Sequence, residues 1–192
     1  MKLTAKRTLI FFVLLLASVG FGLGFDAVAT AVEKSNHPRP ESISPLIAEN
    51  ASQFGVPENI LWATVKEQSD FSSNLVGEDG AVGLMQISPD LYESICRDIL
   101  AQEPLDAGIL YDPETNLRVG SAYLSWLYQR YGVWDTVFAA YHAGVEQVDA
   151  WLKDPACVNA RGMLENIPNK DTLNYIKQIN KSVRAYSELY YE

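Results

Sequence analysis

Apolar residues recur at helical spacing through most of the chain beyond residue 44. The clearest run follows Asp112-Pro113, where Leu117, Leu124 and Tyr131 share one face before Gly132. The same spacing predicts helices over 44–54, 57–68, 134–143, 148–152 and 171–190, and one more from Ser88-Pro89. No stretch alternates apolar and polar residues for long enough to indicate a strand. The sequence therefore predicts a mainly α-helical domain over 44–192.

Helix boundaries carry their own signals. Ser44-Pro45, Ser88-Pro89 and Asp112-Pro113 each place a capping residue before a proline at the first helical position. Segment 72–87 has no helical pattern and is rich in Gly, Ser, Asn and acidic residues. We expect it to form an ordered loop, and such loops in compact helical domains tend to line functional clefts.

The N-terminal segment differs from the rest of the chain. Lys2, Lys6 and Arg7 precede Thr8–Phe25, which holds no charged side chain, as in an export signal. The basic end stays in the cytoplasm, and the remainder is sent outside. Small residues over 27–31 offer cleavage sites, so both a signal peptide and a retained membrane anchor stay open. The expected organisation is a signal peptide or anchor over 1–31, a linker over 32–43 and the domain over 44–192.

Charge and cysteine content narrow the function classes. The chain has 192 residues and a formal net charge of −9, and without its three basic N-terminal residues this becomes −12. Such a surface repels phosphate backbones, so no nucleic acid partner is expected. Cys96 and Cys157 could form a disulfide in an oxidising compartment, but two separate buried thiols are the favoured interpretation. Two cysteines and two histidines at unrelated spacings predict no metal site, and no cofactor is expected.

Four motifs stand in a fixed order. Glu67-Gln-Ser-Asp-Phe71 precedes the loop, Gly80-Ala-Val-Gly-Leu-Met-Gln-Ile87 lies in it, and Ala140-Tyr-His-Ala-Gly144 and Tyr175 follow. Together they resemble the lytic transglycosylases of the goose-type-lysozyme-like superfamily, over roughly residues 44–185. The resemblance implies a lysozyme-like helical domain that acts outside the bacterial membrane, on the membrane face or in the cell wall, with peptidoglycan glycan strands as partner.

The resemblance also implies a reaction and a set of site residues. These enzymes cut the bond between N-acetylmuramic acid and N-acetylglucosamine with one carboxylic acid, which protonates the leaving oxygen and then deprotonates the muramic C6 hydroxyl. A 1,6-anhydro sugar results. Carried over by position, Met85 and Gln86 form the cleft wall, Tyr141 contacts sugar, and Tyr175 hydrogen-bonds near the catalytic carboxyl.

Three positions depart from the family pattern. The catalytic Glu position falls on Gln68, whose amide cannot release a proton at accessible pH. Glu67 is adjacent, but neighbouring helix residues point about 100° apart, so Glu67 could replace it only through a one-residue bulge. Gly77 stands where the family has Ser, and His142 stands where it has Asn.

These departures leave three functions open. The first is a lytic transglycosylase in which Glu67 replaces Gln68 or in which Gln68 was introduced by mutation. The second is a non-catalytic peptidoglycan-binding scaffold, and the third is a hydrolytic muramidase with Glu78 or Asp79 as a second carboxylate. His142 titrates near neutral pH and is a weaker alternative acid, because its place in the motif is a sugar-contact position.

Overall fold

The computed structural model describes residues 28–191, and the chain divides into two compact units, Met1–Pro38 and Arg39–Glu192. In the first unit, residues 28–36 are helical. The expected linker over 32–43 is therefore partly helical, because its first half holds good helix formers such as Glu33 and Lys34. The apolar stretch Thr8–Phe25 lies outside the described residues. Within 28–191, no helix is long and apolar enough to cross a membrane.

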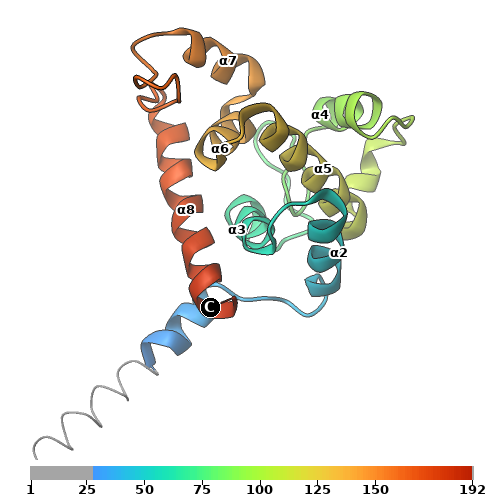
Figure 1. The fold of residues 1–192 in the computed structure, drawn as a ribbon. Helices are drawn as coiled ribbons and strands as arrows, with labels where there is room; N and C mark the ends of the chain where they lie inside the picture. Colours follow the sequence, from blue (N-terminus) through green and yellow to red (C-terminus); the bar gives the residue numbers. More distant parts are fainter. Residues whose placement is uncertain (1–27, 192) are drawn as a thin grey trace, which may run out of the picture. The chain divides into compact units, whose positions relative to one another are not determined.

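The second unit is mainly α-helical, which confirms the predicted class (Figure 1). Its helices in chain order are α2 (Ser44–Phe54), α3 (Glu58–Ser69), α4 (Pro89–Ser94), the π-helix η1 (Ile95–Ile99), the 3₁₀ helix η2 (Ala107–Tyr111), α5 (Pro113–Tyr131), α6 (Trp134–Ala143), α7 (Val145–Lys153) and α8 (Lys170–Tyr190). β-structure in the described part of the chain is limited to isolated bridges, two of them within the loop over 72–87.

The helix boundaries agree with the signals in the sequence with one exception. Ser88 accepts a hydrogen bond from the Leu91 N–H at 3.3 Å, and Asp112 accepts one from the Thr115 N–H at 2.9 Å, as expected of capping residues. Ser44 is not the cap. The helix already begins at Ser44, with Ile43 preceding it and no side-chain cap.

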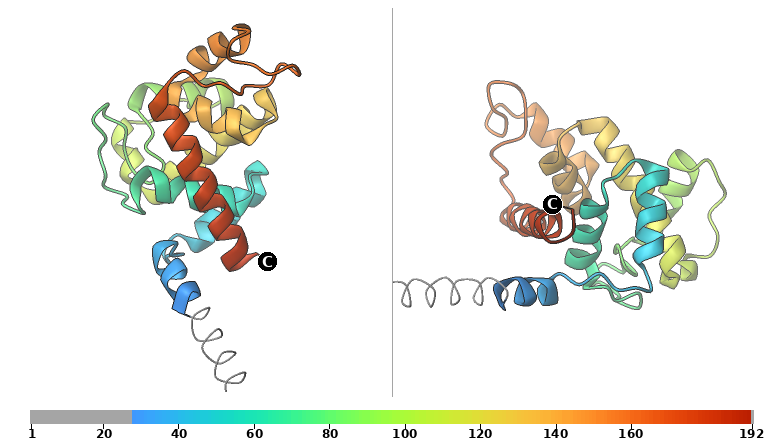
Figure 2. Two further views of the ribbon diagram at one scale, coloured as in Figure 1. Left: turned by 90° about the vertical axis from the view of Figure 1, so that its left-hand side faces the viewer. Right: turned by 60° about the horizontal axis from the view of Figure 1, so that its bottom comes forward.

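Helix α3 lies at the centre of the domain, between α8 on one side and α2 and α5 on the other (Figures 1 and 2). Ile60, Leu61, Trp62 and Val65 of α3 are buried. Side-chain hydrogen bonds set how α3 lies along α8: Asn59 donates to Ser187 at 2.8 Å near one end, and Gln68 donates to Tyr175 at 2.9 Å near the other. The two helices are therefore antiparallel, with residue 68 beside the first turns of α8.

The loop over 72–87 is held against α5 by one buried amide. The Asn116 Oδ1 accepts a hydrogen bond from the Met85 N–H at 2.8 Å, and its Nδ2 donates to the carbonyls of Val82 and Leu110, also at 2.8 Å. Asn116 is fully buried, so it satisfies backbone groups that water cannot reach.

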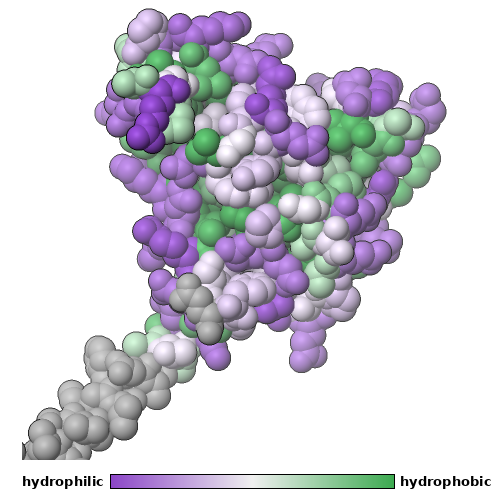
Figure 3. Space-filling view, viewed as in Figure 1, coloured by the Kyte–Doolittle hydropathy of each residue, from purple (hydrophilic) through white to green (hydrophobic). Residues whose placement is uncertain are grey.

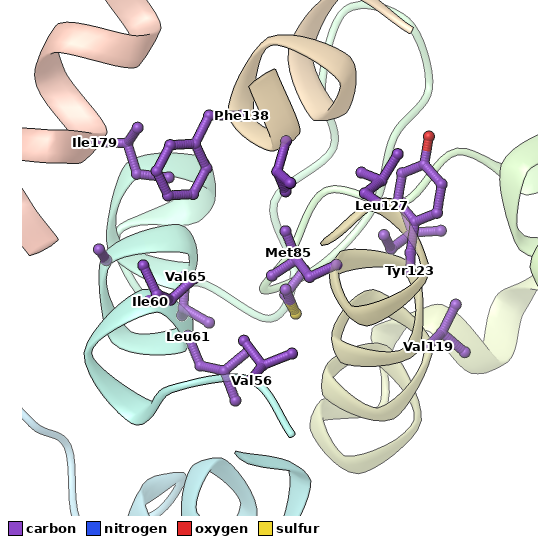
Figure 4. Close-up of a cluster of buried hydrophobic side chains, with 14 of the residues drawn as sticks. Val56, Ile60, Leu61, Val65, Met85, Val119, Tyr123, Leu127, Phe138 and Ile179 are labelled. Carbon is purple, nitrogen blue, oxygen red and sulfur yellow. The ribbon is translucent and has the colours of Figure 1, made fainter. Parts of the chain in front are cut away.

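Two glycines permit this close approach. A Cβ at Gly83 would collide with the Asn116 side chain and lie 2.6 Å from the Leu110 carbonyl, and a Cβ at Gly120 of α5 would collide with the Met85 sulfur. The loop can therefore lie against α5 only because both positions lack a side chain, and the Met85 side chain fills the space between α3 and α5 (Figure 4).

Substitution of the loop residues Gly80 and Gly83 tests the close approach of the loop to α5. Gly80 and Gly83 both have left-handed backbones, with φ of +81° and +82°, but a Cβ at Gly80 would meet nothing within 4 Å. Gly80→Ala should cost only the backbone strain of about 1–2 kcal/mol. Gly83→Ala should cost about 2 kcal/mol more, because it overpacks the loop against Asn116.

The measurement is the free energy of unfolding from urea denaturation, with Gly80→Ala as the matched control. Equal losses in the two variants would contradict the proposed role of the close approach.

Candidate functional site

Three helices bring Gln68, His142 and Tyr175 together. Gln68, in the last turn of α3, donates from Nε2 to the Tyr175 hydroxyl of α8 at 2.9 Å. The His142 ring, at the end of α6, stacks on the Tyr175 ring with centroids 4.8 Å apart. His142 Nδ1 lies 3.1 Å from the Thr172 hydroxyl, one turn earlier in α8. Two of the motifs and the late tyrosine therefore meet at one place in the fold.

Glu67 has a different partner. Helix α3 stays α-helical through Ser69, so the one-residue bulge that Glu67 would need is not present. The Glu67 Oε1 accepts a hydrogen bond from the Ser182 hydroxyl at 2.5 Å, two turns further along α8 than Tyr175. The two neighbouring residues thus contact α8 at separate places, as the helical rotation of about 100° per residue requires.

Met85 and Gln86, the residues expected in the cleft wall, have different surroundings. The Met85 side chain is fully buried, so it supports the loop from behind and does not face a ligand. Gln86 donates from Nε2 to the carbonyls of Leu75 at 3.1 Å and Gly83 at 2.9 Å. A Cβ at Gly77 would lie 2.8 Å from the Gln86 Oε1. The Gln86 amide therefore fills the space that a side chain at position 77 would need.

Tyr141 links α6 to the same loop. Its hydroxyl donates to the Met85 carbonyl at 2.7 Å, and its ring lies 5.6 Å from that of Tyr123 in α5. Burial raises the pKa of the Tyr141 hydroxyl well above its usual range. The hydroxyl is thus a neutral structural donor, and the exposed part of the ring is what a ligand could contact.

The side chains of Gln68, His142 and Tyr175 are themselves uncharged near pH 7. Burial raises the pKa of Tyr175, opposed by the hydrogen bond from Gln68. Burial also lowers the pKa of His142, partly offset by the charge of Asp171, so the imidazole is neutral. Of the two loop carboxylates, Asp79 accepts a hydrogen bond from the Ala81 N–H at 3.1 Å within its own turn. A neutral arrangement of hydroxyl, imidazole and amide groups is suited to hydrogen bonding with an uncharged ligand.

Thiols and metal ligands contribute nothing to this arrangement. Cys96 and Cys157 are both free and buried, which confirms the favoured interpretation of two separate thiols. Among residues 28–191, no group of His, Cys, Asp and Glu side chains could hold a metal ion.

Sequence reasoning missed three residues that position the site. Thr172, Ser182 and Asn116 hold His142, Glu67 and the loop respectively. Asn116 could have been found from the sequence. It lies four positions after Asp112, on the apolar face of the predicted helix, where a polar residue is unusual. Thr172 and Ser182 lie on a helix of mixed polarity and gave no comparable signal.

The domain is helical, its glycine-rich loop is held against α5, and a tyrosine from the late helix α8 meets the end of α3; this arrangement is that of the lysozyme-like class. The transglycosylase SLT domain family matches residues 45–161, and the chain belongs to this family.

Relatives of known function support the same assignment. The soluble lytic murein transglycosylase of Escherichia coli strain K12 is 31% identical over 154 residues, which is 79% of this chain and 23% of the relative. The membrane-bound lytic murein transglycosylase C of Yersinia pestis is 30% identical over 116 residues, 57% of this chain and 32% of that protein. This chain therefore spans about a quarter to a third of the length of these relatives.

Solved structures show the same fold. The 70 kDa soluble lytic transglycosylase of Escherichia coli superposes with a TM-score of 0.74 at 27% identity, covering 83% of this chain and 26% of that one. The Pseudomonas aeruginosa enzyme Slt gives a TM-score of 0.68 at 28% identity, covering 78% of this chain and 24% of that one. That structure is of an inactive mutant in which one glutamate is replaced by glutamine.

The lowered pKa of His142 predicts a pH dependence of stability. The unfolded chain binds a proton at this residue below its ordinary pKa of 6.5, whereas the folded site resists protonation. The stability that the neutral ring contributes is therefore present above pH 6.5 and is lost as the pH falls through 6.5 towards the lowered value.

The melting temperature of the wild type should thus fall more between pH 7 and pH 5 than that of His142→Asn. The difference should be a few degrees at most, because His142 is only partly buried. Parallel curves for the two proteins would show that the site does not resist protonation of His142.

Proposed function

We propose that this chain binds peptidoglycan glycan strands through its SLT domain and does not cleave them by the one-acid reaction of its family. The observation that carries this proposal is the hydrogen bond from the Gln68 amide to the Tyr175 hydroxyl, at the place where the family pattern puts the catalytic carboxyl. Peptidoglycan is the expected ligand, because the relatives are murein transglycosylases.

The one-acid reaction needs a group that first gives and then takes a proton. A carboxyl group at position 68 would lie in a partly buried site beside Tyr175, where burial raises its pKa and keeps a proton available near neutral pH. An amide offers no such proton. Gln68 is able to donate a hydrogen bond to a sugar oxygen and accept one from a sugar hydroxyl, which is enough for binding but not for bond cleavage.

Two further observations support this function. Glu67 is hydrogen-bonded to Ser182 on a regular α-helix, so it does not replace the missing acid in this arrangement. The Pseudomonas aeruginosa relative was made inactive with a single change from glutamate to glutamine. A natural glutamine at the equivalent position would have the same effect here.

We also propose that the domain acts outside the cytoplasmic membrane. The basic residues before the apolar segment Thr8–Phe25 favour export of the domain that comes after it, either behind a cleaved signal or on a retained anchor. Peptidoglycan lies in that compartment, so the proposed location and the proposed ligand agree.

Sedimentation with purified cell-wall sacculi tests binding. The wild type should co-sediment with sacculi, because Gln68, His142 and Tyr141 present hydrogen-bonding groups and a ring to the glycan. His142→Ala should weaken co-sedimentation, whereas Glu49→Ala, a change at an exposed position of α2, should leave it unchanged. Wild-type protein that stays in the supernatant would contradict the proposed function.

Product analysis by mass spectrometry tests the missing acid. Wild type and Glu67→Ala should release no 1,6-anhydro-muropeptides from sacculi, whereas Gln68→Glu should release them at least about 100-fold above the wild-type background, the usual size of a general-acid contribution. Anhydro products from the wild type that vanish in Glu67→Ala would place the acid at Glu67 instead. Products ending in reducing muramic acid would indicate a hydrolytic muramidase.

A further inference from the structure

The hydrogen bond between Gln68 and Tyr175 has a defined direction. Gln68 donates from Nε2, and the Tyr175 hydroxyl accepts at 2.9 Å. Burial raises the pKa of Tyr175, and this donated bond opposes the rise because it stabilises the phenolate form. A hydroxyl that accepts one hydrogen bond still has its own proton to donate. The proton of Tyr175 therefore needs an acceptor other than Gln68.

No side chain in the described part of the chain accepts this proton. Among these residues, Gln68 is the one hydrogen-bond partner of the Tyr175 hydroxyl. The His142 ring lies face to face with the Tyr175 ring, with 29° between their planes, and its Nδ1 lies beside a threonine hydroxyl of α8. The Glu67 carboxylate accepts its hydrogen bond from Ser182. The proton of the Tyr175 hydroxyl thus stays available to a ligand.

A ligand can reach this pair of residues. Gln68 and Tyr175 are each half-buried, and His142 beside them is only partly buried. The space-filling view shows residues of intermediate and apolar hydropathy at the surface between α8 and α4, bordered by strongly hydrophilic ones (Figure 3). An uncharged ligand at the end of α3 would meet two donors side by side, the Tyr175 hydroxyl and the second Nε2 hydrogen of Gln68.

An ionised carboxyl group at position 68 would impose the opposite direction. It has no N–H group, so the only hydrogen bond that it could form with Tyr175 is one in which the tyrosine donates. Such a bond to a charged acceptor is stronger than a bond between neutral groups, so a neutral sugar oxygen would not compete well for the proton. Glutamine at position 68 therefore does more than remove an acid, because it also releases the Tyr175 proton.

We propose that Tyr175 is a hydrogen-bond donor to the bound glycan, and that glutamine at position 68 is what gives it this role. The inference rests on the proposed function, because it assumes that a glycan strand occupies this site. The acceptor is an uncharged oxygen of the strand, and the carbonyl oxygen of an N-acetyl group is the strongest acceptor of this kind. Gln68 and Tyr175 then form a binding pair at the place where the family pattern has an acid.

The side-chain amide signals of Gln68 test the direction of the bond in the protein without ligand. Tyr175→Phe keeps the ring and its stack on His142 but removes the oxygen that accepts from Nε2. In proton–nitrogen correlation spectra, the bonded Nε2 proton of Gln68 should therefore move upfield. The matched control Tyr128→Phe changes an exposed tyrosine of α5 and should not move this signal. A Gln68 signal that also stays in place in Tyr175→Phe would show that Tyr175 donates to Gln68 instead, and would overturn the proposal.

A double-mutant cycle over positions 68 and 175 tests the bond to the ligand. The ligand is the β-1,4-linked hexamer of N-acetylglucosamine, which has no muramic acid and so no bond for the family's reaction. In titration calorimetry, Tyr175→Phe should weaken binding of the hexamer about two- to tenfold in the wild type, the effect of one lost hydrogen bond between neutral groups. In the Gln68→Glu background the same change should cost less than about twofold, because the carboxylate already holds the tyrosine proton.

The outcomes of this cycle are distinct. Equal losses in the two backgrounds would show that Tyr175 acts through packing alone, which would overturn the proposal and leave the proposed function standing. Failure of the wild type to bind both the hexamer and sacculi would contradict the proposed function itself, and the role of Tyr175 with it. Tyr128→Phe should leave the affinity for the hexamer unchanged in both backgrounds, which separates loss of the Tyr175 hydroxyl from a general effect of removing a tyrosine hydroxyl.

Discussion

The site of this protein depends on the side-chain amide of Asn116. Buried in α5, it accepts a hydrogen bond from the Met85 N–H and donates to the carbonyls of Val82 and Leu110. These bonds fix the loop over 72–87 without a strand or helix of its own. The Met85 carbonyl then accepts from Tyr141, so the position of the loop also determines how the end of α6 is held. Loss of this amide would leave several backbone groups buried and unsatisfied, which makes its contribution larger than that of one ordinary hydrogen bond.

Because α3 and α8 are antiparallel neighbours, two adjacent residues of α3 contact different residues of α8. Gln68 reaches Tyr175, and Glu67 reaches Ser182, although the two residues are neighbours in the chain. A carboxylate is thus present in the same helical turn but bound to a serine away from the stacked pair of His142 and Tyr175. The family's fold is retained, and the proposed change of function comes from which of two adjacent positions carries the acid.

The sequence alone predicted the structural features that depend on periodicity and on local signals. The long helix ending at Gly132 and the capping by Ser88 and Asp112 are confirmed, because helical spacing and capping involve residues close together in the chain. The family motifs also indicated that positions 68 and 175 belong to one site.

Contacts between elements could not be predicted in this way. Met85 faces the core and Gln86 bonds to its own loop, because α5 leaves room at Gly120 and position 77 carries no side chain.

The central claim is that position 68, and not position 67, faces the glycosidic bond. A crystal structure of the wild-type domain with an N-acetylated glycan tetramer tests it directly. We expect an uncleaved tetramer whose glycosidic oxygen accepts a hydrogen bond from the Gln68 amide, with Glu67 still bound to Ser182 and α3 unchanged. A bulge in α3 that brings the Glu67 carboxylate to the glycosidic oxygen, or a 1,6-anhydro product in the cleft, would contradict it.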